Sequence, residues 1–264
     1  MIPLRDDIPA RRRPVVNWLI LAVTSVAFLM QLATPDEDPS LVERFGMIPQ
    51  RVTEPGSLVL IPSYQTIQTP RGVVQETVRA QAAEPAVPPW ATLVTCVFLH
   101  GGWLHFLGNM WFLWIFGDNV EDRFGRFGYL LLYLGCGALA SLSHLITDPH
   151  SVIPTIGASG AIAGVMGSYL LSYPHARVVS LVPLGILFFT VVVPAPLFLG
   201  VWFLIQLYQG SGVASVATDG VAWWAHIGGF AVGAALTAVG SRSGWLAPTT
   251  RRRQLSLGGR VGRA

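Results

Sequence analysis

Four polar residues that could act together in hydrolysis lie in three long apolar segments of this chain. Ser159 lies at the start of one segment, and His226 lies near the start of another. His105 and Asn109, four residues apart, lie in the third. Hydrocarbon offers such side chains no hydrogen-bond partners, so polar residues inside membrane segments are rare and usually functional. Their combination predicts hydrolytic chemistry within a membrane.

Ser159 and His226 have the residue types of a nucleophile and its base. A serine hydroxyl is a poor nucleophile until a base takes its proton, and a neutral imidazole can do so. No aspartate or glutamate lies in the half of any apolar segment that carries these residues. The sequence therefore predicts a Ser-His dyad whose imidazole is held by packing. Approach of Asp148 or Asp219 from the loops stays open as an alternative.

His105 and Asn109 have the residue types that stabilise negative charge on oxygen. Four residues apart, they share one face of a helix, and the backbone N–H of Ser159 at a helix start is a third donor. Together they could hold the oxyanion formed in acyl transfer, where losing one donor typically costs about 100- to 1000-fold in rate. Gly157, which precedes the serine, is assigned to the same oxyanion or substrate-binding site.

Glycines recur at a spacing of four beside both members of the dyad, at Gly160 and Gly164 and at Gly229 and Gly233. Membrane helices use such small-residue patterns for close packing, so each pattern alone predicts packing and not catalysis. The two interpretations hold together if the glycine faces let the two helices approach until the serine reaches the histidine.

The composition places the chain in the membrane class. Hydrophobic residues make up 52% of its 264 residues and charged residues 12%, about half the charged share of a soluble domain. All 17 basic residues are arginines. The clusters at 11–13 and 251–253 indicate topology determinants and contacts with membrane lipids. No aromatic or folded platform accompanies them, so no nucleic-acid partner is expected.

The hydropathy pattern predicts an all-α integral membrane protein with six transmembrane helices. An interfacial piece starting at Val178 is expected before the fifth helix, which prolines at 194 and 196 delimit. The predicted spans are Val15–Leu32, Trp103–Phe116, Phe127–Ile146, Thr155–Tyr173, Pro196–Tyr208 and Val221–Val239.

Three parts follow from this pattern. An N-terminal arm at 1–14 precedes the membrane domain at 15–241, and an arginine-rich tail follows at 242–264. The domain includes a long outer loop at 33–102, which we expect to be partly disordered at 63–88 because that stretch is rich in polar residues and proline. The loop is expected to end in a membrane-associated hairpin before the second span.

Arginine placement predicts that both termini are cytoplasmic. Arginines gather in the arm, in the tail and in the loops after the second and fourth spans, whereas the two short outer loops carry none. The second, fourth and sixth spans then enter from the outside. His105, Ser159 and His226 consequently share one depth, a little below the outer surface. A multi-pass protein of the cell membrane is expected.

These residues resemble the motifs of the rhomboid family of intramembrane serine proteases. The similarity runs from about Trp90 to Val239 and rests on three motifs in the family's order. They are His105-x-x-x-Asn109, Gly157-Ala158-Ser159-Gly160 and His226-x-x-Gly229-x-x-x-Gly233. The resemblance implies Ser159 as nucleophile, His226 as general base, and His105 with Asn109 at the oxyanion site. It also implies a rhomboid-like bundle with an outward-opening, water-filled cavity, and transmembrane proteins as substrates. No metal or cofactor is expected.

One departure from the family pattern concerns the surroundings of His226. Some members place a tyrosine against this histidine, four residues after the serine, where this chain has Ala163. Trp202, Trp223 and Trp224 are the candidates to pack on the imidazole instead.

Other functions stay open. An inactive relative could bind transmembrane clients, although a binder needs neither the serine nor the base. A channel could use His105 and Asn109 as a polar pathway, although the sequence lacks the buried carboxylates common in transporters. A metal site of His100, His105 and His226 lacks a carboxylate or cysteine to complete its ligands. The sequence also leaves the oligomeric state open.

Overall fold

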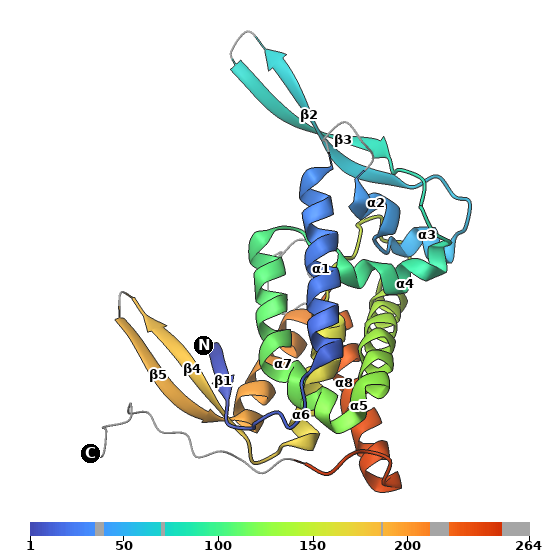
Figure 1. Ribbon diagram of the computed structural model, residues 1–264. Coiled ribbons are helices and arrows are strands. Elements are labelled where there is room, and N and C mark those ends of the chain that lie inside the picture. The colour runs from blue at the N-terminus through green and yellow to red at the C-terminus, as the bar shows by residue number, and fades with distance from the viewer. Residues whose placement is uncertain (35–39, 70–71, 186, 212–221, 250–264) are drawn as a thin grey trace.

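The computed structural model describes residues 1–34, 40–69, 72–185, 187–211 and 222–249, and most of them are helical. By length and composition, α1 and α5 are long and apolar enough to cross a membrane, and α6 and α7 are shorter apolar helices. The long helices lie side by side as a bundle (Figure 1) and are α1 (Val15–Ala33), α5 (Trp103–Thr147), α6 (Ser159–Ser172), α7 (Ala195–Gly210) and α8 (Trp223–Ser243).

Helix α5 consists of two helices joined by a break at Gly125. This residue has a φ of 71°, in the left-handed region that glycine adopts without a Cβ clash. The break lies between the predicted spans Trp103–Phe116 and Phe127–Ile146. Both spans therefore belong to α5, one on each side of Gly125. Each of the six predicted spans overlaps a helical segment of the described chain, although α6 starts only at Ser159 instead of Thr155.

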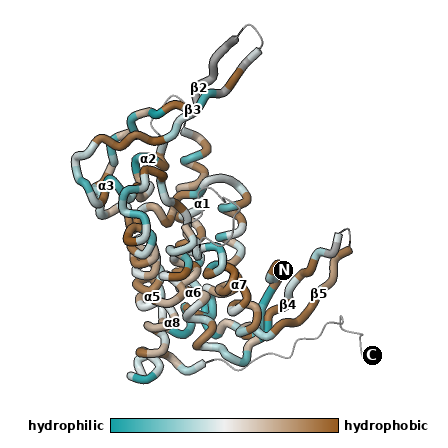
Figure 2. Tube along the Cα trace, turned by 180° about the vertical axis from the view of Figure 1, so that it is seen from behind, coloured by the Kyte–Doolittle hydropathy of each residue, from teal (hydrophilic) through white to brown (hydrophobic). Residues whose placement is uncertain are grey.

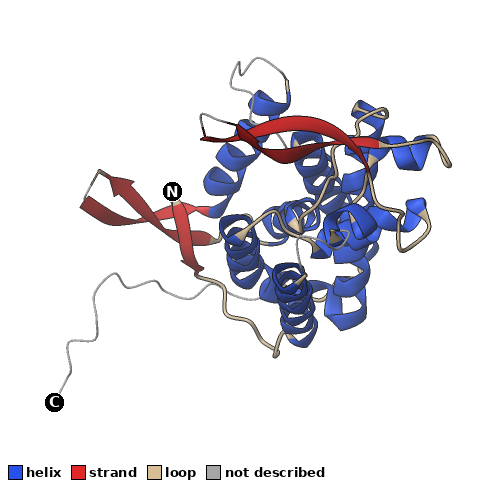
Figure 3. Cartoon of the chain, turned by 90° about the horizontal axis from the view of Figure 1, so that it is seen from above, coloured by secondary structure: helices blue, strands red, loops and turns tan. Residues whose placement is uncertain are grey.

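Two antiparallel sheets lie at opposite ends of the bundle (Figure 1), and the one that contains the N-terminal strand extends to one side of the helices when seen from above (Figure 3). One is the hairpin of β2 (Leu60–Thr69) and β3 (Gly72–Gln81). The other has the order β1-β4-β5 and is formed by β1 (Ile2–Asp6), β4 (Arg177–Leu184) and β5 (Leu187–Pro194). The all-α prediction was therefore wrong in this respect, because the chain is mostly helical but carries two small sheets.

The sheets occupy two segments for which the sequence predicted something else. Hairpin β2–β3 covers most of the stretch 63–88 expected to be partly disordered, and hairpin β4–β5 replaces the interfacial piece expected from Val178. Both segments are rich in valine, which favours strands, as do the threonines of hairpin β2–β3 and the two phenylalanines of β5. Hydrophobic residues run along β5 and α7 (Figure 2). Strand β1 pairs with β4, so the arm at 1–14 is joined to the chain that follows α6. Of the tail at 242–264, residues 250–264 lie outside the described part.

Short helical pieces lie between hairpin β2–β3 and the bundle (Figure 1). Among them, Met47 exchanges two backbone hydrogen bonds with Thr155, with N···O distances of 3.1 and 2.7 Å. The long outer loop thereby fixes the segment of chain that leads into Ser159. The pieces are α2 (Leu41–Phe45), α3 (Pro49–Thr53), the 3₁₀ turn η1 (Pro89–Ala91), α4 (Thr92–Thr95) and the 3₁₀ turn η2 (Cys96–Phe98).

Two acidic residues at the end of the first half of α5 hold the start of α1. The Glu121 carboxylate accepts hydrogen bonds from the backbone N–H groups of Val16 and Asn17, at 3.2 and 2.8 Å. The Asp122 carboxylate accepts from the backbone N–H groups of Arg11 and Arg12. The bonds to Val16 and Asn17 satisfy amides that a helix start leaves without intrahelical partners, and the bonds to Arg11 and Arg12 hold the segment that leads into α1. They tie α1 to the bundle at the end opposite to the one where α5 begins.

Helix α6 is the centre of the bundle, and its approach to α8 is set by glycines. Every residue of α6 from Gly160 to Tyr169 is buried. A Cβ on Gly229 would lie 2.0 Å from the carbonyl oxygen of Gly160, and one on Gly233 would lie 1.9 Å from that of Gly164. No side chain fits at either position. The backbones are therefore in contact, as the glycine patterns predicted, and the first turns of both helices are brought together.

We expect the substitution Gly233→Ala to destabilise the bundle by about 3 kcal/mol, because its Cβ would overlap a backbone carbonyl that cannot move independently of α6. The free energy of unfolding in detergent measures this. Gly135→Ala on α5 is the matched control, since a Cβ there meets nothing within 4 Å. Equal stability of the two variants would contradict the packing described for α6 and α8.

Candidate active site

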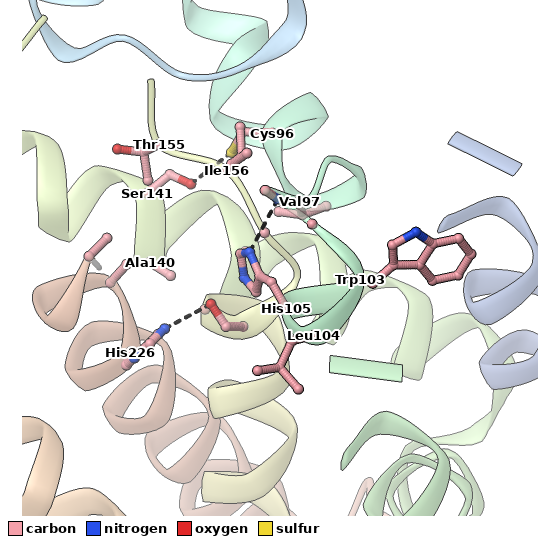
Figure 4. Close-up of a pocket in the computed structure, with 18 residues that line it drawn as sticks. Cys96, Val97, Trp103, Leu104, His105, Ala140, Ser141, Thr155, Ile156 and His226 are labelled. Carbon is pink, nitrogen blue, oxygen red and sulfur yellow. Dashed lines mark hydrogen bonds between the residues drawn. The ribbon is translucent and has the colours of Figure 1, made fainter. Parts of the chain in front are cut away.

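The structure brings Ser159 and His226 together. Ser159 is the first residue of α6, and His226 lies in the first turn of α8. The hydroxyl oxygen of Ser159 lies 2.7 Å from Nε2 of His226 (Figure 4). This is hydrogen-bonding distance for a nucleophile and its base, which the chemistry of serine hydrolysis requires.

The loop before Ser159 has a conformation that depends on glycine. Gly157 has a φ of 122°, in a region that side chains rarely adopt, and its N–H donates to the carbonyl of Cys96 at 3.0 Å. This bond attaches the loop to η2. The chain then turns into α6, so the backbone N–H of Ser159 lies at a helix start, where amides have no intrahelical acceptor.

His226 makes a second hydrogen bond that the sequence analysis missed. Its Nδ1 lies 2.7 Å from Oε1 of Gln206, which is on α7 and only 5% exposed. The prediction that packing alone holds the imidazole was therefore wrong. The sequence does mark Gln206, because it is a polar residue within the apolar run of α7. Polar residues inside membrane segments are usually functional, and the four residues of the predicted site were selected by that rule. The alternative carboxylate Asp148 has no bond to His226, and Asp219 lies outside the described residues.

Two tryptophan rings pack on the imidazole of His226. The ring centroid of Trp202, from α7, lies 5.9 Å from that of His226. The ring of Trp223, from the start of α8, lies at the same 5.9 Å and is nearly perpendicular to the imidazole, at 86°. Two of the three candidate tryptophans therefore pack on His226, whereas Trp224 is 41% exposed and has no ring contact with the imidazole among the described residues.

His105 points its Nε2 toward the space beside the serine. Its Nδ1 accepts a hydrogen bond from the N–H of Gly101 at 3.3 Å, which leaves the hydrogen of a neutral ring on Nε2 (Figure 4). A Cβ added to Gly157 would lie 2.7 Å from Nε2 of His105 and 3.7 Å from Oγ of Ser159. The space beside Gly157 thus lies between Nε2 of His105, a hydrogen-bond donor, and the hydroxyl of Ser159. An oxyanion formed by attack of the serine needs a donor placed in this way.

Asn109 is a buried donor without a partner. It is 8% exposed, and its amide nitrogen Nδ2 has no hydrogen-bond partner in the described part of the chain. A buried unpaired donor costs about 1–3 kcal/mol, so such a group is expected to have a partner at some stage of function. It lines the same groove as Ser159 and His226.

The dyad lies where a cavity meets a groove. The cavity has a volume of about 700 Å³ and reaches the dyad from the side of η2 and the loop before α6. The groove has a volume of about 340 Å³ and runs between α5 and α7, where Asn109, Trp202 and Gln206 line it. His105, Ser159 and His226 line both spaces. In the described residues, no group of three or more histidines, cysteines or carboxylates could hold a metal ion.

The arrangement agrees with a known family. The family model of the Rhomboid domain matches residues 88–243, more than half of the chain and all of the site described above. The chain belongs to the rhomboid family. The resemblance inferred from the three sequence motifs is thereby confirmed at the level of the family.

Several curated proteins carry the rhomboid name and match part of this chain. Rhomboid-like protein 11, chloroplastic, of Arabidopsis thaliana is 36% identical over 101 residues, which are 37% of this chain and 36% of the relative. RHOMBOID-like protein 5 of the same plant is 31% identical over 179 residues, 63% of this chain and 53% of the relative. Rhomboid protease GluP of Bacillus subtilis is 31% identical over 140 residues, 53% of this chain and 24% of the relative. The chain thus spans about half or less of the length of these relatives.

We expect Gly157→Ala to slow the reaction of Ser159 with a fluorophosphonate by roughly 100-fold, because the new methyl group fills the space beside His105 and the backbone favours glycine. Labelling kinetics followed by mass spectrometry measure this effect. Gly56→Ala is the matched control, since Gly56 also has a left-handed φ of 87° but a Cβ there meets nothing within 4 Å. A labelling rate unchanged in Gly157→Ala would contradict the role assigned to this space.

Proposed function

We propose that this rhomboid is an intramembrane serine endopeptidase that cleaves transmembrane protein substrates near the outer leaflet of the cell membrane. The observation that carries the proposal is the 2.7 Å contact between the Ser159 hydroxyl and Nε2 of His226. A binding protein has no use for this contact. The polar groups around the dyad are, by type, those that acyl transfer needs.

The proposed topology has six membrane crossings and both termini in the cytoplasm. The lengths of α1 and α5 and the arginine distribution support it. Helix α6 has 14 residues, about 21 Å at 1.5 Å per residue, which is shorter than the roughly 30 Å hydrocarbon core. A helix this short leaves Ser159 below the outer surface, where the cavity can supply water.

In the proposed reaction a substrate helix enters from the lipid through the groove between α5 and α7 and unwinds locally. The Ser159 hydroxyl attacks the exposed carbonyl carbon while Nε2 of His226 takes its proton. The carbonyl oxygen becomes negative and accepts hydrogen bonds from His105, Asn109 and the backbone N–H of Ser159.

The tetrahedral intermediate then collapses to products. His226 returns the proton to the leaving amine, the C–N bond breaks, and the substrate's carbonyl stays bound to Ser159 as an ester. Water from the cavity attacks this ester with His226 again as base, which releases the acid and restores the hydroxyl. No other reactant is needed.

We expect Ser159→Ala and His226→Ala each to lower the rate of substrate cleavage by a thousandfold or more, roughly to background, because the nucleophile and its base act as one unit. Purified protein in liposomes with a fluorescent transmembrane substrate gives the rate. Ser141→Ala is the matched control, since Ser141 lines the same cavity but its hydroxyl lies 3.3 Å from Sγ of Cys96.

Retained cleavage by Ser159→Ala would remove the proposal. Absence of both cleavage and fluorophosphonate labelling in the wild type would favour the alternative, an inactive rhomboid that binds transmembrane clients.

We expect Asn109→Ala to lower kcat by about 100-fold with little change in KM, because the lost donor acts on charge that exists only in the transition state. Steady-state kinetics in liposomes separate the two constants. A change confined to KM would assign Asn109 to substrate binding and contradict its place in the oxyanion site.

A further inference from the structure

The contact between Gln206 and His226 has no role in the reaction as written above. The bond joins two helices, since Gln206 belongs to α7 and His226 to α8. Gln206 is also buried, and the residues that precede it in α7 are apolar. Burial of an amide is unfavourable unless its groups are hydrogen-bonded. Both ends of the Gln206 amide have hydrogen-bond partners, which determine the direction in which the amide points.

The orientation of the Gln206 amide follows from its two partners. Its Nε2 donates to the carbonyl of Trp202, one turn earlier on α7, at 3.3 Å. A carbonyl oxygen only accepts, so the nitrogen end of the amide must face Trp202. Oε1 then faces the imidazole, in agreement with its 2.7 Å distance from Nδ1 of His226.

This orientation fixes the tautomer of His226. Because Oε1 of Gln206 can only accept, the hydrogen of the neutral ring lies on Nδ1. Nε2 then carries the lone pair, and it faces the Ser159 hydroxyl at 2.7 Å. The other tautomer would place two acceptors against each other at Gln206 and would leave no base at the serine.

We propose that Gln206 is a positioning residue, whose amide oxygen holds the His226 imidazole in the tautomer and orientation that can accept the serine proton. The inference rests on the proposed protease function and adds a third member to the predicted dyad. Gln206 thus has the place that an aspartate has in soluble Ser-His-Asp triads, but it carries no charge. The rings of Trp202 and Trp223 restrict the tilt of the imidazole, whereas only the amide selects which nitrogen carries the hydrogen.

The position of Gln206 also links the base to the substrate's path. Gln206 and Trp202 line the groove between α5 and α7, and both contact His226 from α7. The base is therefore held by the helix that forms one wall of the groove. Its orientation depends on α7 lying against α8, in addition to the contact of α6 with α8.

The test replaces the acceptor and then restores it. In Gln206→Met the length of the side chain is kept and the acceptor is lost. We expect kcat to fall by about 100-fold or more, with KM nearly unchanged, because an incorrect tautomer can cost up to about 10⁴-fold. In Gln206→Glu an acceptor returns at the same position, so most of kcat should return. Its carboxylate favours the imidazolium, so the acid limb of the kcat–pH profile should move to higher pH.

Gln209→Met is the matched control, because it makes the same change one turn along α7 where no bond to His226 exists. If Gln206→Met keeps the wild-type kcat while Ser159→Ala is inactive, the positioning role is overturned and the protease function stands. If both Gln206 variants lose kcat together with their melting temperature, Gln206 is a packing residue and the inference is again overturned. If the wild type itself neither cleaves nor reacts with the fluorophosphonate, the proposed function fails and this inference fails with it.

Discussion

The backbone contact between α6 and α8 is the constraint on which the site depends. Gly229 and Gly233 have no room for even a methyl group against the carbonyls of Gly160 and Gly164. A side chain at either glycine would force the two backbones apart and would move His226 away from Ser159. The close contact of α6 and α8 at these glycines therefore allows the 2.7 Å hydrogen bond between Ser159 and His226.

A second feature of the site is a chain of hydrogen bonds that contains no permanent charge. It runs from the Trp202 carbonyl through the Gln206 amide to the imidazole and the Ser159 hydroxyl. Each link has a defined donor and acceptor, so the chain has one direction. In surroundings of low dielectric constant, such bonds are stronger than in water, and an unpaired member would be costly. Satisfaction of every link keeps the site in a single arrangement.

The sequence predicted the helices from local patterns, and the structure brings the predicted pair Ser159 and His226 into contact. Long apolar runs locate α1, α5 and α8 to within a few residues, and the two glycine patterns identify which helices touch. Strands β4 and β5 were missed because the apolar residues around Val178 fit either a helix or a buried strand, and pairing with the distant β1 decides between them. Hairpin β2–β3 was missed because the polar residues and proline of its stretch are typical of disorder. Gln206 is marked in the sequence as a polar residue within an apolar run, but its partner His226 lies on another helix, and no local pattern identifies that partner.

The uncharged amide on α7 has a consequence for biogenesis. An aspartate in a membrane segment costs up to roughly 2.5–3.5 kcal/mol during insertion by the translocon, the full cost applying at the helix centre, before any partner histidine is in place to compensate for it. A glutamine lowers that barrier, so α7 can enter the bilayer as an independent segment. Under the proposed function, His226 becomes the base of Ser159 only when the inserted helices assemble, so the serine is activated only in the folded protein.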